Sequence, residues 1–305
     1  MKGKAQPRAW RLLPTLKMGG AAHMALDQAL LEAAAEEGFP PTMRFMLWEP
    51  PTLSLGRFQP IEEIDMEACS SSGIEVVRRP TGGRSILHMD DFTYSIVIPA
   101  SLQLPGNVVE AYAYLCRGII AALSALGIEA SVHHGAGDRY ADAGGACFSA
   151  STQADLKHKG RKICGSAQVR QEGAVLQHGS LLLEDRSRLL FSLLSYGDER
   201  ERSAALAAYQ AGCITLREAG WDGKWEDIAA CFRRGFEESF DVSLREEALT
   251  PREDRGWREL SGAYRSQAWL MNRRSKSLPR EIPRQRGLKS VKITHNELSQ
   301  EEDYK

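Results

Sequence analysis

A predicted β-hairpin limits most strongly what this chain can fold into. Residues 162–170 and 174–183 both have strand composition, and only Gln171, Glu172 and Gly173 separate them. A link this short joins antiparallel strands, because a parallel crossover needs about a dozen residues or more. The hairpin therefore excludes an all-parallel doubly wound sheet and favours an α+β fold with a mixed or antiparallel central sheet.

Helices are predicted on both sides of the hairpin in the sequence. Residues 24–37 consist mainly of strong helix formers and are followed by Gly38. In residues 108–126 apolar side chains recur at steps of three and four, and Gly127 follows as a C-terminal cap. Helical composition returns in two later stretches, 189–211 and 225–240. Further short strands are predicted at 52–55, 74–78, 92–98 and 128–133.

One large domain is expected to carry the functional site. Its predicted bounds are residues 10–250, and a helical extension is predicted at 251–272. From Arg273 onward basic residues dominate, large apolar side chains are scarce, and the last residues turn acidic. Such a composition cannot build a core, so residues 273–305 are expected to form a flexible tail.

The charge of the chain is nearly balanced, since 39 basic and 40 acidic residues give a net charge of −1. A chain that binds nucleic acid or an anionic membrane along its whole length would usually show a basic excess. No apolar run approaches the roughly 20 residues of a membrane span, and the first residues lack the apolar core of a secretory signal. We expect a cytoplasmic protein that binds neither nucleic acid nor membrane.

The six cysteines lack the close spacing of a zinc site or a disulfide framework. We therefore expect free thiols and no metal site. Cys116 lies in the apolar helix predicted at 108–126, and Cys231 also has apolar neighbours. Cys147 differs, because it follows small residues at the end of a stretch, 135–145, that is typical of a loop. A loop cysteine by itself is still more often inert than catalytic.

A glycine turn between two predicted strands carries two arginines. Arg78 and Arg79 precede Gly82 and Gly83, and the glycine pair permits a tight turn with exposed N–H groups. Arginines beside such a turn could bind a phosphate, a carboxylate or an acyl carbonyl. An ordinary β-turn with solvated charges is the commoner explanation of the same residues.

Polar side chains interrupt the apolar strands of the hairpin. Lys162 opens the first strand close to Cys164, and an ammonium beside a thiol stabilises the thiolate. Ser166, Gln168 and His178 are further polar residues in these strands. Taken singly, a surface lysine at a strand edge and a hydrogen-bonded core histidine explain them equally well.

In their order and spacing, these segments resemble the lipoate and octanoate transfer branch of the biotin/lipoyl protein ligase-like family. The resemblance is strongest to its octanoyltransferases of the LipM type and covers about residues 10–240. It rests on the strings MALDQALL, PTMRFMLWEPPTLSLGRFQ, VVRRPTGGRSILH, FTYSIV, ACF, GRKICGSAQVRQ and LQHGSLLL. The fold that it implies is a biotin/lipoyl protein ligase-like catalytic domain.

The resemblance also implies roles for individual residues. The loop cysteine, here Cys147, forms an acyl thioester, and the lysine of the K-x-x-G-S-A-Q strand, here Lys162, lowers the pKa of that thiol. The residues expected to bind the acyl chain and pantetheine are Arg79, Gly82, Gly83, His88, Ser166, Gln168, His178 and Gly179. Relatives often carry an acidic residue nearer the histidine, so no role is assigned to Asp90 or Asp91.

The implied reaction moves an octanoyl group from octanoyl acyl carrier protein, through the Cys147 thioester, to a lysine of the glycine-cleavage H protein, without a cofactor. Two rival enzymes share the fold. An ATP-dependent lipoate–protein ligase needs no cysteine, and its loop commonly has a third glycine where this chain has Arg84. An octanoyl amidotransferase would move the group from H protein to dehydrogenase E2 subunits. A nucleic-acid-binding protein that uses the basic tail is disfavoured by the balanced charge.

Overall fold

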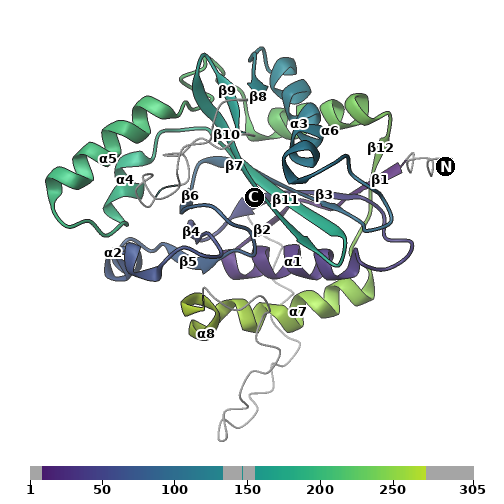
Figure 1. The fold of residues 1–305 in the computed structure, drawn as a ribbon, viewed down its shortest axis with the longest axis horizontal. Coiled ribbons are helices and arrows are strands. Elements are labelled where there is room, and N and C mark those ends of the chain that lie inside the picture. Colours follow the sequence, from purple (N-terminus) through teal and green to yellow (C-terminus); the bar gives the residue numbers. More distant parts are fainter. Residues whose placement is uncertain (1–8, 133–145, 147–154, 273–305) are drawn as a thin grey trace, which may run out of the picture.

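The computed structural model describes residues 9–132, 146 and 155–272 of the chain. Within these residues the fold is built on a large mixed sheet, seen at the centre of Figure 1. Its strands are β1 (Ala9–Leu12), β2 (Leu16–Met18), β3 (Thr42–Trp48), β7 (Asp91–Ile98), β8 (Ser131–Val132), β9 (Leu156–His158), β10 (Arg161–Gln171), β11 (Ala174–Leu182) and β12 (Ser243–Glu246). The predicted tail, 273–305, lies outside the described residues.

The strand order is β12-β1-β3-β7-β11-β10-β9-β8, with β2 beside β3. Strands β12, β1 and β2 join this sheet through parallel pairs, whereas every pair from β3 to β8 is antiparallel. The prediction of an α+β fold with a mixed sheet is confirmed. The hairpin that led to it is β10–β11, and its turn residues Glu172 and Gly173 have φ of 50° and 84°. Two successive positive φ values give the turn a twist that matches the strands.

A second, smaller sheet has the order β5-β4-β6 and lies at one side of the large one (Figure 1). Its strands are β4 (Thr52–Leu55), β5 (Glu75–Arg78) and β6 (Ile86–His88). The 3-10 turn η1 (Ile61–Glu63) and the helix α2 (Met66–Ser71) lie between β4 and β5 in the sequence. The glycine turn connects β5 to β6, so the R-R-P-T-G-G motif lies where the two sheets approach each other.

Seven further helices complete the described fold. They are α1 (Gly20–Ala33), α3 (Val108–Ala125), α4 (Ser187–Ser192), α5 (Glu199–Gly212), α6 (Trp225–Phe240), α7 (Pro251–Arg265) and α8 (Gln267–Met271). Helices α3 and α6 cover one face of the large sheet, and α1 covers the other with α7 packed beneath it (Figure 1). The residues predicted as a helical extension form α7 and α8.

The α3–α6 face holds the main apolar core. Leu115, Cys116 and Ile119 of α3 are completely buried there. By length and composition α3 is also long and apolar enough to span a membrane, contrary to the expectation that no segment is, and it is the one described helix that passes this test. In the structure it is the core helix of a folded domain. A Cβ on its Gly118 would lie 2.7 Å from the Phe236 ring, so glycine permits the close approach of α3 to α6.

Three predicted elements differ from the structure by more than one residue. Helix α1 ends at Ala33, four residues before the predicted end at Glu37. Helix α1 starts at Gly20 instead of Met24, because the Glu75 carboxylate accepts hydrogen bonds from the N–H groups of Gly20 and Ala21 at 2.7 and 3.2 Å. The capping residue is 54–55 positions away in the sequence, so no neighbouring residue predicts this helix start. The stretch 189–211 is two helices, since the Asp198 side chain caps a new one by accepting from Glu201 N–H. Of the strand predicted at 128–133, the described part forms only the two residues of β8.

Candidate active site

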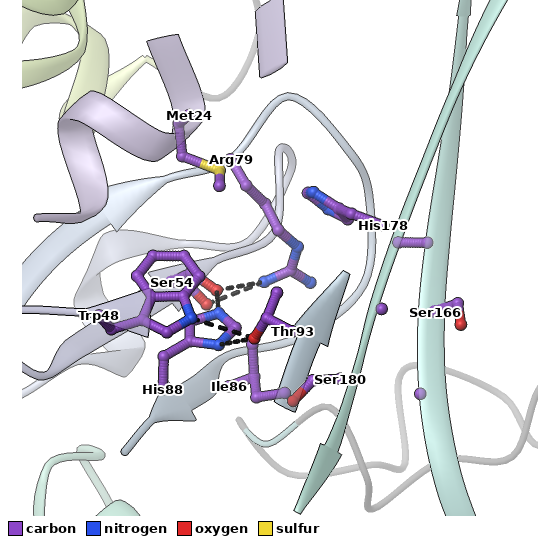
Figure 2. A pocket seen from close by; sticks show the side chains of 13 residues that line it. Met24, Trp48, Ser54, Arg79, Ile86, His88, Thr93, Ser166, His178 and Ser180 are labelled. Carbon is purple, nitrogen blue, oxygen red and sulfur yellow. Dashed lines mark hydrogen bonds between the residues drawn. The ribbon is translucent and has the colours of Figure 1, made fainter. Parts of the chain in front are cut away.

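The candidate active site is a pocket between the two sheets, beside the N-terminal half of α1 (Figure 2). Its empty space amounts to about 390 Å³ when the solvent at its open mouth is counted. The residues that line it are Met24, Trp48, Ser54, Arg79, Ile86, His88, Thr93, Gly165, Ser166, Ala167, His178, Gly179 and Ser180. Five of the predicted binding residues are among them: Arg79, His88, Ser166, His178 and Gly179.

Strands β10 and β11 form one wall of the pocket, and their small residues leave room beside it. The register pairs Gly165 with Ser180 and Ser166 with Gly179. A Cβ on Gly179 would lie 2.4 Å from Ser166 Oγ and 2.7 Å from the Tyr94 hydroxyl. Only glycine fits at this position, because the Ser166 and Tyr94 hydroxyls are hydrogen-bonded to each other at 2.7 Å.

His178 is held on both sides by hydrogen bonds. Its Nδ1–H donates to Asp27 Oδ2 at 3.1 Å, and its Nε2 accepts from the Thr81 hydroxyl at 2.5 Å. Burial lowers the pKa of His178 more than Asp27 raises it, which keeps the imidazole neutral. His178 therefore links α1 to Thr81 of the glycine turn.

The Asp27 carboxylate is completely buried, and its Oδ1 forms an ion pair with the Arg44 guanidinium at 2.9 Å. Burial alone would raise the pKa of Asp27, but the Arg44 charge and the hydrogen bond from His178 outweigh it and lower the pKa to about 2. Ser95 Oγ donates to the same carboxylate at 2.8 Å. Arg44, Ser95 and His178 are register partners on the neighbouring strands β3, β7 and β11. The Asp27 carboxylate therefore links one residue from each of the three strands.

His88 lies on the other side of the pocket with a second carboxylate, Asp91. His88 Nδ1–H donates to Asp91 Oδ2 at 2.8 Å, and Nε2 accepts from Ser54 Oγ at 2.9 Å. Asp91 also accepts from the hydroxyls of Thr93 and Ser180 at 2.7 and 2.6 Å. Asp91, which was assigned no role from the sequence, is thus a buried acceptor shared by three residues that line the pocket.

Arg79 and Arg78 hold backbone carbonyls around the pocket. Arg79 donates to the carbonyls of Ser54, Gly82 and Arg84 at 2.7–3.2 Å, which fixes the glycine turn against β4. Arg78 donates to carbonyls of the segment 56–59 and to that of Leu270 in α8. The two arginines thus shape the loops beside the pocket, and Arg79 also lines it.

Gly82, Gly83 and Gln168 do not line the pocket. Gly83 has φ of 95°, and its carbonyl oxygen would lie 1.8 Å from a Cβ on Gly56. The turn therefore needs glycine on both sides of this contact. Gln168 donates instead to Gln177 Oε1 across the hairpin at 3.2 Å.

Lys162 is 2% exposed, and its ammonium pairs with the Asp155 carboxylate at 3.0 Å. The interpretation of Lys162 as a surface lysine is therefore wrong. It lies on β10 three residues before Gly165, about 10 Å along the strand from the pocket wall. Cys147 lies outside the described residues. The residue before it, Ala146, is buried and forms a bridge with Ser85, the neighbour of the pocket residue Ile86.

Sequence reasoning missed Asp27, Trp48, Ser54 and Thr93, because their roles depend on contacts between distant segments. Asp27 has the one usable signal, because an acidic residue occupies a buried-type position in a mostly apolar helix. Among the described residues no group of three or more His, Cys, Asp or Glu side chains could hold a metal ion. The five described cysteines are all buried and free.

Comparison with known proteins assigns the chain to a family. The model of the lipoyl protein ligase A/B catalytic domain matches residues 20–237. Octanoyltransferase LipM of Symbiobacterium thermophilum is 39% identical over 271 residues, which cover 87% of this chain and 98% of that protein. Octanoyltransferase LipM of Geobacillus kaustophilus is 38% identical over 273 residues, with the same coverage of 87% and 98%.

Solved structures agree on the fold. The bi-partite lipoate protein ligase of Thermoplasma acidophilum superposes with a TM-score of 0.74 at 23% identity, covering 87% of this chain and 97% of that one. A lipoate-protein ligase A bound with ATP gives a TM-score of 0.72 at 23% identity, covering 86% and 98%. The chain therefore belongs to the lipoyl protein ligase A/B catalytic-domain family and, within it, to the octanoyltransferases of the LipM type.

Proposed function

We propose that this enzyme moves an octanoyl group from octanoyl acyl carrier protein to a lysine of the glycine-cleavage H protein, with Cys147 as the nucleophile. Octanoyl transfer in lipoate biosynthesis follows from the family. The donor, the acceptor and the thioester intermediate are our inference. So is the cytoplasm as the place of the reaction.

One observation carries the proposal. The lining of the pocket exposes mainly apolar surface, and two anchored segments lead to the two proposed catalytic residues. Ala146 is bridged to Ser85 at the edge of the pocket, immediately before Cys147. Lys162 lies on the strand that continues into Gly165 and Ser166 of the pocket wall. Asp155 compensates the charge of the buried Lys162 ammonium.

The proposed chemistry proceeds in two balanced steps. The Cys147 thiolate attacks the carbonyl carbon of the donor thioester, the bond from carbon to the donor sulfur breaks, and the departing thiolate takes up a proton. A neutral lysine amine of the acceptor then attacks the Cys147 thioester. The C–N bond forms, the C–S bond breaks, and a proton passes from the amine to the Cys147 sulfur. Because the donor is already activated, no ATP is needed.

The rival activity is an ATP-dependent ligase, since solved proteins of this fold include lipoate ligases. Arg84 supports the transferase. Its guanidinium pairs with Glu63 of η1 at 3.0 Å, and it stands where the ligase loop commonly has a third glycine. A bulky, ion-paired side chain at this position leaves less backbone open to a nucleotide phosphate.

The deciding assay combines full-length enzyme and apo H protein with each donor in turn and measures product by intact mass. We expect octanoylation from octanoyl carrier protein with ATP and Mg²⁺ both absent, and none from free octanoate with ATP and Mg²⁺. The opposite result would make the enzyme a ligase. Octanoyl-H protein offered as donor, with an E2 lipoyl domain as acceptor, tests the amidotransferase alternative; a lipoate ligase of this fold has been solved with its E2 lipoyl domain.

The nucleophile is tested with Cys147→Ala, and Cys116→Ala in the buried face of α3 serves as the control. The first variant should lose transfer and the hydroxylamine-labile acyl adduct, whereas the second should keep both. A labile adduct on another cysteine, with Cys147 unmodified, would contradict the proposal.

Lys162 is tested through the pH dependence of Cys147 alkylation. A neighbouring cation lowers a thiol pKa from about 8.5 to a range of roughly 3.5–7.5. Lys162→Met should therefore shift the alkylation profile to higher pH. A profile that stays unchanged would leave Lys162 as a structural partner of Asp155 only.

A further inference from the structure

We propose that Phe58 and Met271 form a surface that binds the donor acyl carrier protein. This inference rests on the proposed function, because it takes that carrier protein to be the donor. Phe58 is 67% exposed and Met271 is 60% exposed, the two highest values among the large apolar side chains that the structure describes as exposed. Single exposed apolar residues are ordinary on a protein surface, whereas neighbouring ones often mark an interface.

The two side chains are neighbours because one buried arginine holds both of their segments. The Arg78 guanidinium donates to the Arg57 carbonyl at 3.3 Å and to the Leu270 carbonyl at 2.7 Å. These are the carbonyls immediately before Phe58 and Met271 in the chain. Figure 1 shows the same arrangement of elements, with α8 beside the smaller sheet. Both exposed side chains therefore project from one fixed junction.

This junction holds the backbone at Phe58 in place before any partner binds. Arg78 also donates to the carbonyls of Gly56 and Gln59, at 2.9 and 2.7 Å, and so fixes the chain on both sides of Phe58. An aromatic side chain on a fixed backbone loses little conformational entropy on binding. Aromatic and methionine side chains are also enriched at protein interfaces. The local structure therefore suits a binding anchor.

The surface formed by Phe58 and Met271 lies close to the segment that carries the proposed nucleophile. Gln59 Oε1, next to Phe58 in the chain, accepts a hydrogen bond from Ser85 Oγ at 3.0 Å. Ser85 forms the bridge with Ala146, the residue before Cys147. The pantetheine arm of a carrier protein is long, so the carrier can bind beside Cys147 and still deliver its thioester. A lysine side chain is much shorter, so this position fits the donor better than the acceptor.

The charge around the surface favours an acidic partner. Arg57 is 5% exposed, and among the described residues its guanidinium contacts the Asn272 carbonyl and the Trp269 ring but forms no ion pair. The chain continues after Asn272 with residues 273–292, which contain eight basic residues and one acidic residue. Acyl carrier proteins are acidic, so their charge is complementary to this end of the chain.

The test measures the first half of the reaction alone, because the proposed transfer passes through an acyl-enzyme. Full-length wild type and Phe58→Ser are each mixed with octanoyl carrier protein without acceptor, and acylation of the enzyme is followed by intact mass. We expect the second-order rate constant of Phe58→Ser to be about tenfold lower, an effect typical of a central interface residue. With octanoyl pantetheine, a donor without the protein, the two rate constants should agree within about twofold.

Further variants separate the apolar contribution from the electrostatic one. Met271→Ser should lower the rate constant with octanoyl carrier protein about threefold. Truncation after Asn272 should lower it about tenfold at low salt and much less at high salt, where surface charges are screened. The control is Val108→Ser, because Val108 is also exposed, at 52%, but lies at the start of α3. It should react like the wild type.

The outcomes separate this inference from the function on which it rests. An equal loss with both donors would mean that Phe58 shapes the pocket, and a loss confined to transfer from the acyl-enzyme to H protein would assign the surface to the acceptor. Either result, or unchanged acylation, overturns the inference. If octanoyl carrier protein does not acylate the wild type, the proposed function fails instead. Binding of fluorescently labelled carrier protein to wild type and Phe58→Ser then decides the role of the surface.

Discussion

The two faces of the large sheet differ sharply although the same strands supply both. On the α3–α6 face, Phe45 and Tyr94 are neighbours in the register and pack with Phe92 and Phe232, whose centroids are 4.7 Å apart. On the α1 face, the next row along the strands consists of Arg44, Ser95 and His178 around Asp27. One face is an apolar core, and the other is a buried polar network that ends in the pocket.

The two faces therefore contribute differently: the apolar face mainly stabilises the fold, and the polar face mainly fixes the arrangement of the pocket. The packing of an apolar face tolerates changes in side-chain shape, and every apolar surface that it buries adds to the free energy of unfolding. A buried polar network is stabilising only when each donor and acceptor is matched, and it then allows a single arrangement. Changes on the α3–α6 face should therefore reduce stability and spare the pocket, whereas changes on the α1 face should affect both.

The largest loss of stability is expected from Phe232→Ala on the apolar face. Phe232 is fully buried, and emptying such a site costs about 3–5 kcal/mol of unfolding free energy. Urea unfolding measures the loss, and kcat/KM of the folded enzyme for octanoyl transfer should stay unchanged. Phe58→Ala is the control, since Phe58 is 67% exposed and should cost less than about 0.5 kcal/mol. A changed kcat/KM of Phe232→Ala would mean that the two faces are coupled.

Asp27→Asn should cost about 3 kcal/mol, because it leaves the buried Arg44 guanidinium without its carboxylate. It should also slow acyl transfer, since His178 loses its charged acceptor. The double variant Asp27→Asn/Arg44→Met tests the pairing and should be more stable than the sum of the single changes by at least about 1 kcal/mol. Additive losses in urea unfolding would show that the pair is not coupled.

Gly118→Ala probes the α3–α6 contact directly. The new methyl would meet the Phe236 ring, and such overpacking costs about 1–3 kcal/mol. Gly212→Ala, at the end of α5 with no atom within 4 Å of its Cβ, should be neutral or slightly stabilising. Thermal unfolding of both variants would compare them, and equal melting temperatures would refute close packing at Gly118.

The polar face should make the protein sensitive to acid. Burial, with help from Arg44, lowers the pKa of His23 from 6.5 to about 3, so the unfolded chain takes up a proton in this range and the folded one does not. The unfolding free energy should therefore fall as the pH drops from about 6.5 to about 3. His23→Gln should reduce that slope by up to about 1.4 kcal/mol per pH unit. An unchanged slope would assign the acid sensitivity to other groups.

Elements with strong local signals were predicted well. Helices α3 and α6 have the predicted bounds to within one residue, and the β10–β11 hairpin turns at the predicted place. Periodicity and turn residues act within a few positions, which is why they can be recognised in the sequence. The start of α1 could not be recognised in this way, because the residue that caps it, Glu75, is distant in the sequence.

The sequence by itself determined the fold class, the family and the candidates Lys162, His88 and His178, because residue types at fixed spacings carry that information. Only the tertiary structure decided that Asp27 and Asp91 are the buried acceptors of the two histidines and that Trp48 forms a pocket wall. Asp27 and His178 are 151 residues apart in the chain, and Trp48 and Thr93 are 45 apart. Hydrogen bonds act over about 3 Å, so such partners exist only after the two sheets and α1 have packed together.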